Sequence, residues 1–298
     1  MAEAPPTIPK NEHTENIPAG VAWMLLTGLL FVAVTGIVRY LGSDLPAAEG
    51  AFIRYAIGLL MISPALLSIF RRKLSARTWT LYGARGLVHG IAVSLWFFAM
   101  ARIPVAEVTA IGYSSPIFVT IGAALFLGER LRMRRLIAVL IGLVGVLIIL
   151  RPGFQEIGSG QMAQLIAAPL FAASFLLAKK LTDEADSAEI VAMLSLGCTI
   201  VLLPMALAEW RDPTWEEVGW LALTALCATA GHYTLTRAYA CAPITVTQPI
   251  TFLQIVWATI LGVVAFGEPA DVFITAGAAV IVASAWYIAR REMQLKET

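Results

Sequence analysis

Apolar residues fill ten stretches of this chain, and short polar segments separate each stretch from the next. A helix needs about 20 apolar residues to cross the hydrocarbon core of a bilayer. The pattern therefore predicts an all-α integral membrane protein with ten transmembrane helices. The expected spans are 19–38, 47–70, 79–101, 106–127, 134–150, 160–180, 187–209, 215–240, 243–266 and 270–289.

Lysine and arginine are distributed unevenly over the connections between these spans. With the N-terminus inside the cell, the cytoplasmic segments hold fourteen of them, and the opposite side holds four: Arg39, Arg102, Arg151 and Arg211. Positive residues concentrate on the cytoplasmic side of membrane proteins. We therefore expect an inner-membrane or plasma-membrane protein with both termini in the cytoplasm.

Composition supports a membrane protein, with 59% hydrophobic and 14% charged residues, where soluble domains have about 25% charged residues. The connections are too short to house a catalytic domain. Phosphate-binding loops, metal-ligand spacing and catalytic triads are absent from the sequence, so we expect no enzyme activity, no cofactor and no metal. The net charge of +1 argues against a nucleic-acid partner. The lipid bilayer and a small-molecule substrate are the expected partners.

The two halves of the chain repeat each other. Shifts of 140 and then 139 residues superpose Gly20 on Gly160, Phe31 on Phe171, Pro104 on Pro243, and Gly128-Glu129 on Gly267-Glu268. The expected organisation is a disordered cytoplasmic tail (1–18), a first five-helix repeat (19–155), a second (156–291) and a C-terminal cytoplasmic tail (292–298). Five spans per half make this a 5+5 inverted repeat, an architecture of secondary transporters.

The ends of spans three and four carry a family resemblance. Residues 99–104 (AMARIP), Pro116 and residues 127–129 (LGE), with second copies at 238–243 and 266–268, resemble the drug/metabolite transporter superfamily of EamA type. Arg54 resembles that family's arginine in the second span. Among members, the chain is most similar to YddG-type amino-acid exporters. The second half has Leu194 and Ile255 where Arg54 and Pro116 would repeat, so exact functional symmetry is not expected.

Two histidines lie in spans that the repeat relates. His89 is in span three, and His232 in span eight aligns with Val93, four residues from His89. Positions i and i+4 share one helix face, so both histidines are expected on equivalent faces, with Trp96 and Tyr239 continuing the two stripes. The functional interpretation is a cavity lining, with proton coupling as an open possibility. The alternative is a pair of helix-bridging hydrogen bonds.

Polar residues and prolines interrupt spans four and nine. Pro116 and Pro249 each remove a backbone hydrogen bond, and Tyr113, Ser114, Gln248 and Gln254 lie beside them. Such interruptions are tolerated at membrane depth where protein or a water-filled cavity satisfies the freed groups. We therefore expect hinges at Pro116 and Pro249 with substrate-contacting side chains around them. A packing kink is the alternative.

Other candidates are a charge, an aromatic ring and two carboxylates. Arg54 is expected either to meet a substrate carboxylate or to pair with Glu49 or Glu107, and Trp23 is deep enough to face a ligand. Glu129 and Glu268, which follow glycines at helix ends, are candidate gate residues or plain solvated caps.

The resemblance implies a secondary transporter that exports small metabolites, above all neutral or aromatic amino acids, by alternating access through a central cavity. A nucleoside-like or drug-like cargo is the alternative within the superfamily. A non-transporting membrane scaffold is the alternative outside it. Both a monomer and a weak homodimer fit the small-residue patterns of spans five and ten.

Overall fold

The computed structural model describes residues 16–42, 44–70, 74–112, 114–128, 133–151, 158–251 and 253–267, with scattered positions between 272 and 287. All regular structure in these residues is helical. The helices are α1 (Ile17–Leu41), α2 (Ala47–Phe70), α3 (Ala76–Met100), α4 (Val105–Gly112), α5 (Ser115–Phe126), α6 (Met133–Leu150), α7 (Ser159–Leu181), α8 (Ser187–Ala208), α9 (Trp215–Cys241), α10 (Ile244–Thr251) and α11 (Leu253–Phe266).

Seven of the expected spans correspond to one helix each, with ends that differ by a few residues. Within the described residues, five helical segments are long and apolar enough to cross a bilayer: α1, the Ala47–Leu66 part of α2, α3, α7 and α8. The expected span four is divided into two shorter helices, α4 and α5, with a turn at Ser114 between them. In span nine, α10 and α11 lie on either side of residue 252, which is outside the described residues. The expected span 270–289 lies largely outside the described residues.

Spans four and nine differ in where the proline lies relative to the helices. In the first, α4 ends at Gly112 and Pro116 lies in the first turn of α5, where a missing N–H costs nothing. In span nine, Pro249 lies inside α10, two residues before Thr251, the last described residue of that helix. Proline therefore coincides with the start of a new helix in span four and lies within a helix in span nine.

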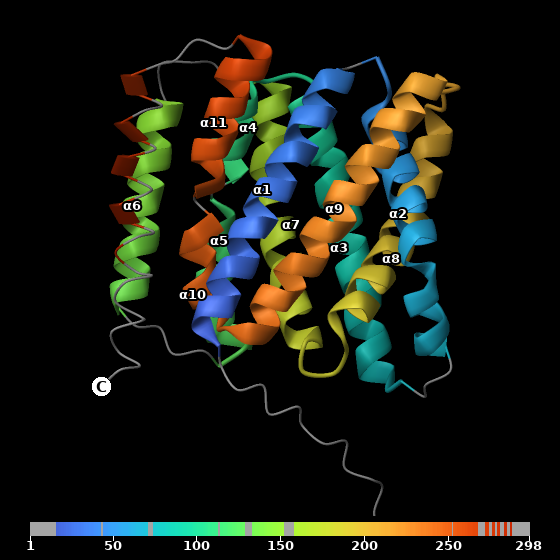
Figure 1. Cartoon of the computed structure of the whole chain (residues 1–298), viewed down its shortest axis with the longest axis horizontal. Helices are drawn as coiled ribbons and strands as arrows, with labels where there is room; N and C mark the ends of the chain where they lie inside the picture. Colours follow the sequence, from blue (N-terminus) through green and yellow to red (C-terminus); the bar gives the residue numbers. More distant parts are fainter. Residues whose placement is uncertain are drawn as a thin grey trace, which may run out of the picture.

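The most extensive helix packing joins the two halves rather than helices of one half. The longest contacts join α1 to α9, α3 to α7 and α2 to α8. The repeat relates α1 to α7 and α3 to α9, so the α1–α9 and α3–α7 contacts are equivalent. It also relates α2 to α8, so the α2–α8 contact is equivalent to itself. Figure 1 shows α1 and α7 running in opposite directions through the bundle. The fold is an all-α membrane fold built from a 5+5 inverted repeat.

Two glycine contacts repeat this symmetry at atomic detail. A Cβ on Gly20 would lie 2.7 Å from Ala242 Cβ, and a Cβ on Gly160 would lie 2.9 Å from Ile103 Cγ2. The shift of 140 relates the glycines, and the shift of 139 relates their partners. Because neither site has room for a side chain, glycine permits the close approach of α1 to the end of α9 and of α7 to the end of α3.

A further close approach joins α3 to α8. A Cβ on Gly86 would lie 2.8 Å from the Cα of Gly197, and a Cβ on Gly197 would lie 2.8 Å from the Cα of Gly86. Backbone therefore meets backbone at this crossing, as small residues allow in membrane helices.

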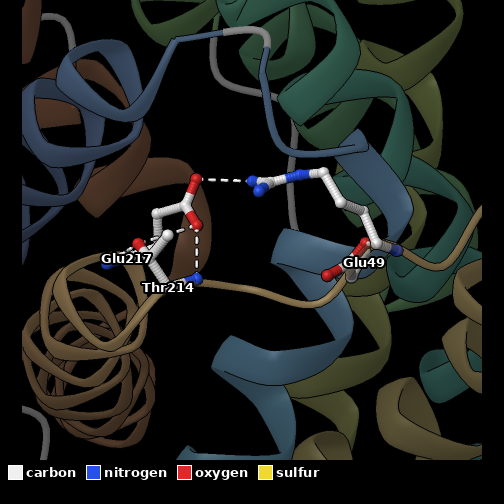
Figure 2. Close-up of polar contacts among 4 residues, drawn as sticks. Glu49, Thr214 and Glu217 are labelled. Atoms are coloured by element: carbon white, nitrogen blue, oxygen red, sulfur yellow. Dashed lines mark hydrogen bonds and ion pairs between the residues drawn. The ribbon is translucent and has the colours of Figure 1, made fainter.

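One loop fixes the starts of α2 and α9 to each other. The backbone N–H of Arg211 donates to Glu49 Oε2 (2.9 Å), and its Nη2 donates to Glu217 Oε1 (2.5 Å). Thr214 and Glu217 form a capping box at the start of α9. Figure 2 shows Glu49, Thr214 and Glu217 around this loop. The hydrogen bond to Glu217 raises the pKa of Arg211 above its ordinary value.

The glycines of the two Gly-Glu pairs adopt the left-handed conformation that favours glycine at a helix end. The φ angles are 68° at Gly128 and 64° at Gly267. Their partners Glu129 and Glu268 lie outside the described residues, so their assignment as gate residues stays a prediction.

Candidate functional site

A cavity with about 190 Å³ of space open to water lies inside the bundle, where every described helix except α6 and α8 contributes to its wall. Most of the wall is aromatic or aliphatic. The aromatic and imidazole rings that line it are Phe31, Tyr55, His89, Trp96, Phe97, Phe171, Phe175, His232 and Tyr239. This composition is typical of small-molecule sites, which are mostly apolar with a few convergent polar groups.

Four of these rings form a continuous edge-to-face row. The rings of His89 and His232 have centroids 5.0 Å apart at an interplanar angle of 73°. Phe171 packs against His89 at 5.2 Å, and Phe31 packs against His232 at 5.1 Å. Since the repeat relates Phe31 to Phe171, the row crosses the boundary between the halves with near-symmetric ends.

The buried polar atoms of the cavity wall differ in whether they have a hydrogen-bond partner. His89 Nδ1 is bonded to Ser174 Oγ at 2.8 Å. His232 Nδ1, Arg54 Nη1 and Gln164 Oε1 are buried and have no hydrogen-bond partner among the described residues. Unpaired buried polar atoms are costly, and all three side chains line the cavity. They are therefore the atoms at which a ligand would gain most from forming a hydrogen bond.

Arg54 does not form either of the ion pairs that the sequence suggests. Glu49 Oε2 accepts from the Arg211 N–H, and Glu107 Oε1 accepts from Gln161 Nε2 at 2.9 Å. Arg54 is 5% exposed and places its guanidinium 3.8 Å from the centroid of the Tyr55 ring. Of the two interpretations, the ion pair with Glu49 or Glu107 is not formed.

The remaining sequence-predicted residues divide into three groups. His89, His232, Trp96, Tyr239, Gln254 and Arg54 line the cavity, whereas Trp23 and Ser114 do not. The Trp23 ring packs beside Arg237, and the Ser114 hydroxyl donates to the carbonyl of Ile111. Tyr113 and the side chains of Gln248, Pro116 and Pro249 lie outside the described part of the chain.

Phe31, Phe171 and Gln164 are cavity residues that the sequence analysis does not propose as site residues. Phe31 and Phe171 appear in the repeat alignment, but an alignment of apolar residues does not tell cavity from core. Gln164 does carry a chemical signal, because it is an amide in an apolar span where the first repeat has Met24. Ser115, which donates to the carbonyl of Ala168 at 2.5 Å, lines the cavity beside the predicted Ser114.

A second cavity of about 630 Å³ lies at the end of the bundle where α1 and α3 end. Phe97 lines both cavities and is 6% exposed. A Cβ on Gly50 would lie 3.3 Å from its ring, so glycine makes room for the ring. Phe97 therefore separates the central cavity from the second one.

Comparison with protein families decides the class of the protein. The EamA-like transporter family matches residues 18–151 and again residues 158–290. The chain belongs to this family. It is a membrane transporter protein and not an enzyme, as the sequence predicts.

Three named relatives match nearly the whole length of this chain. A riboflavin transporter of Vibrio cholerae is 31% identical and covers 92% of this chain and 93% of its own. An S-adenosylmethionine uptake transporter of Rickettsia bellii is 24% identical over 93% of this chain and 96% of its own. A pseudopaline exporter of Pseudomonas aeruginosa is 27% identical over 92% of this chain and 97% of its own.

These names do not support the amino-acid substrate and the export direction that the sequence analysis expects. The EamA family is confirmed, but none of the three relatives is named as an amino-acid exporter, and uptake and export both occur among them. A solved crystal structure with a TM-score of 0.70 and 21% identity covers 92% of this chain and 97% of its own. It supports the fold alone.

Proposed function

We propose that this EamA-family protein is a secondary transporter for flat, uncharged heteroaromatic metabolites, with riboflavin as the first candidate. The observation that carries the proposal is the character of the central cavity. Its wall holds a row of four edge-to-face rings with Trp96 and Tyr239, and no Asp, Glu or Lys is among the described residues that line it.

The aromatic wall favours a planar ring system. Aromatic pairs contribute about 0.5–1.5 kcal/mol each beyond the area that they bury. A tricyclic flavin ring offers both faces and its edges to such contacts. A zwitterionic amino acid would bring an ammonium group into a wall whose described residues offer no carboxylate, and an unpaired charge is expensive to desolvate.

The unpaired polar atoms fit the polar edge of such a ring. Arg54 Nη1 is a donor and Gln164 Oε1 is an acceptor. The pyrimidine edge of a flavin presents carbonyl oxygens and one N–H, which are the complementary groups. The riboflavin transporter of Vibrio cholerae, at 31% identity over nearly the full length, supports the same class.

The proposed mechanism is alternating access across ten spans with both termini in the cytoplasm. The fourteen-to-four bias of lysine and arginine supports this orientation. This orientation places the end of the bundle that holds Arg39 on the outer side of the membrane and the end that holds Lys179 on the cytoplasmic side. The proline-containing spans four and nine supply the hinges, and the direction of net flux follows the substrate gradient.

Counterflow into proteoliposomes tests the substrate. Purified protein is reconstituted with unlabelled riboflavin inside, and uptake of labelled riboflavin, tryptophan, adenosine and S-adenosylmethionine is compared. Saturable exchange of riboflavin is expected. The variant Phe171→Leu should weaken it, while Phe118→Leu, on a side chain that is 46% exposed on α5, should not. Exchange of tryptophan without riboflavin would overturn the proposal in favour of the amino-acid exporter that the sequence suggested.

A further inference from the structure

Arg39 and Lys179 occupy equivalent positions of the repeat and make equivalent hydrogen bonds at opposite ends of the bundle. Arg39 Nη1 donates to the carbonyls of Met100 (3.2 Å) and Ile103 (3.3 Å) at the end of α3. Lys179 Nζ donates to the carbonyls of Tyr239 (2.6 Å) and Ala242 (3.3 Å) at the end of α9. The shifts of 140 and 139 residues relate both donors and both pairs of acceptors.

Each of these contacts links one helix pair, α1 with α9, to the other helix pair, α3 with α7. The pairs α1–α9 and α3–α7 are held by long packing contacts between the halves, and the central cavity lies between them. Arg39 connects α1 to α3 at the end where both helices finish. Lys179 connects α7 to α9 at the other end, as the course of these helices in Figure 1 shows.

The chemistry of the contacts makes them strong but reversible. The last carbonyls of a helix have no partner within the helix and carry the negative end of its dipole. A charged donor forms stronger hydrogen bonds to them than a neutral one. Arg39 and Lys179 are both half-buried, so water can take over the donors when a contact breaks.

We propose that Arg39 and Lys179 are the two latches of the transport cycle, released one at a time. Release of Arg39 from α3 opens the cavity at that end while Lys179 holds the other, and the reverse step opens the Lys179 end. This inference rests on the alternating-access transport proposed above. Both latches are formed in this structure, the arrangement of a state in which neither end is open.

Thiol labelling from each side of the membrane tests the latches without any substrate. The reporter is Thr35→Cys, at a cavity-lining position that is 5% exposed. The background carries Cys227→Ala and Cys241→Ala and keeps Cys198, which is fully buried. Sealed vesicles of either orientation are treated with a membrane-impermeant maleimide. The ratio of labelling from the two sides is the readout.

The two latch variants are expected to shift this ratio in opposite directions. Arg39→Gln should raise labelling from the Arg39 end about tenfold relative to the other, and Lys179→Gln should do the reverse; tenfold corresponds to about 1.4 kcal/mol. Arg102→Gln and Lys180→Gln are the matched controls, because each removes a neighbouring cation at the same end. They should leave the ratio within about twofold of the parent.

Some results would overturn the proposal. A plain helix cap would change labelling equally from both sides, or not at all. Arg39→Lys and Lys179→Arg each introduce the cation of the equivalent position, so both should keep the latch. A tenfold shift of the labelling ratio in either variant would contradict the proposal. This test holds even if the glutamine variants do not fold. Failure of riboflavin counterflow leaves this test intact, whereas symmetric labelling rejects the latches and leaves the riboflavin proposal standing.

Discussion

The imidazole of His89 on α3 and the imidazole of His232 on α9 meet edge to face, with their centroids 5.0 Å apart. The repeat aligns His232 with Val93 rather than with His89. The two rings nevertheless meet, because α3 and α9 run in opposite directions. The difference of one helical turn between the aligned positions therefore places both histidines at the same level of the bundle. A contact between the halves is thus made by residues that are not copies of each other.

Removing one ring of this pair should impair transport. His232→Ala deletes the contacts to His89 and Phe31, so counterflow of riboflavin should fall by about 2- to 12-fold, from about 0.5–1.5 kcal/mol for an aromatic contact. Cys227→Ala is the control, because Cys227 is on the same helix but does not line the cavity. Equal rates for two folded variants would remove the ring row from the mechanism.

Gln164 should set the preference for a ligand with a ring N–H. Gln164→Met removes the unpaired acceptor Oε1 and introduces the residue that the first repeat has at the equivalent position, Met24. The KM for riboflavin should rise by about 2- to 12-fold, as expected for one hydrogen bond of about 0.5–1.5 kcal/mol. The melting temperature should not fall, because an unsatisfied buried group is removed.

A methylated analogue provides the check on this prediction. Wild-type protein should prefer riboflavin to a derivative methylated at the ring imide nitrogen, and Gln164→Met should lose that preference. If the variant keeps the full discrimination, Gln164 does not contact this edge of the ligand.

Phe97 should control exchange between the two cavities. Phe97→Leu shortens the side chain that separates them, so leakage of preloaded riboflavin from proteoliposomes without external substrate should increase several-fold. Phe98→Leu is the control, because Phe98 lines the second cavity alone and packs under Arg102 at 3.5 Å. An unchanged leak in Phe97→Leu would mean that other side chains form the seal.

The backbone contact between α3 and α8 should tolerate no side chain. Gly86→Ala places a Cβ 2.8 Å from the Cα of Gly197, and such overpacking costs about 1–3 kcal/mol. Gly83→Ala, three residues away with nothing within 4 Å of its Cβ, should be neutral or stabilising because alanine favours helix. Thermal unfolding in detergent measures both, and a melting temperature for Gly86→Ala at or above that of Gly83→Ala would contradict the close packing.

The helices and their ends could largely be predicted from the sequence, because a bilayer imposes a length and a polarity on every span. The division of span four was signalled by Pro116, which cannot continue the hydrogen-bond ladder. Pro249, by contrast, is accommodated inside α10. Hydropathy alone does not say how much distortion a helix absorbs before it ends.

The candidate site could be predicted only in part, and the reason is physical. His89, His232 and Arg54 stand out because ionisable groups at membrane depth need a polar environment. Phe31, Phe171 and Gln164 do not, since rings and a neutral amide suit a packed core as well as a cavity wall. Trp23 shows the converse, a deep aromatic ring that packs against a core cluster and beside Arg237 rather than lining the cavity.

The meeting of Gly86 and Gly197 has a mechanical consequence for α3. A crossing with no side chains between the backbones can act as a fulcrum, and the helix arm from Gly86 to Met100 is about 21 Å long at 1.5 Å per residue. A tilt of about 10° around it would carry Met100 about 4 Å, more than the length of a hydrogen bond. His89, one turn from the fulcrum, would move by less than about 1 Å. The end of the helix can thus swing free of Arg39 while the rings at the centre stay almost where they are.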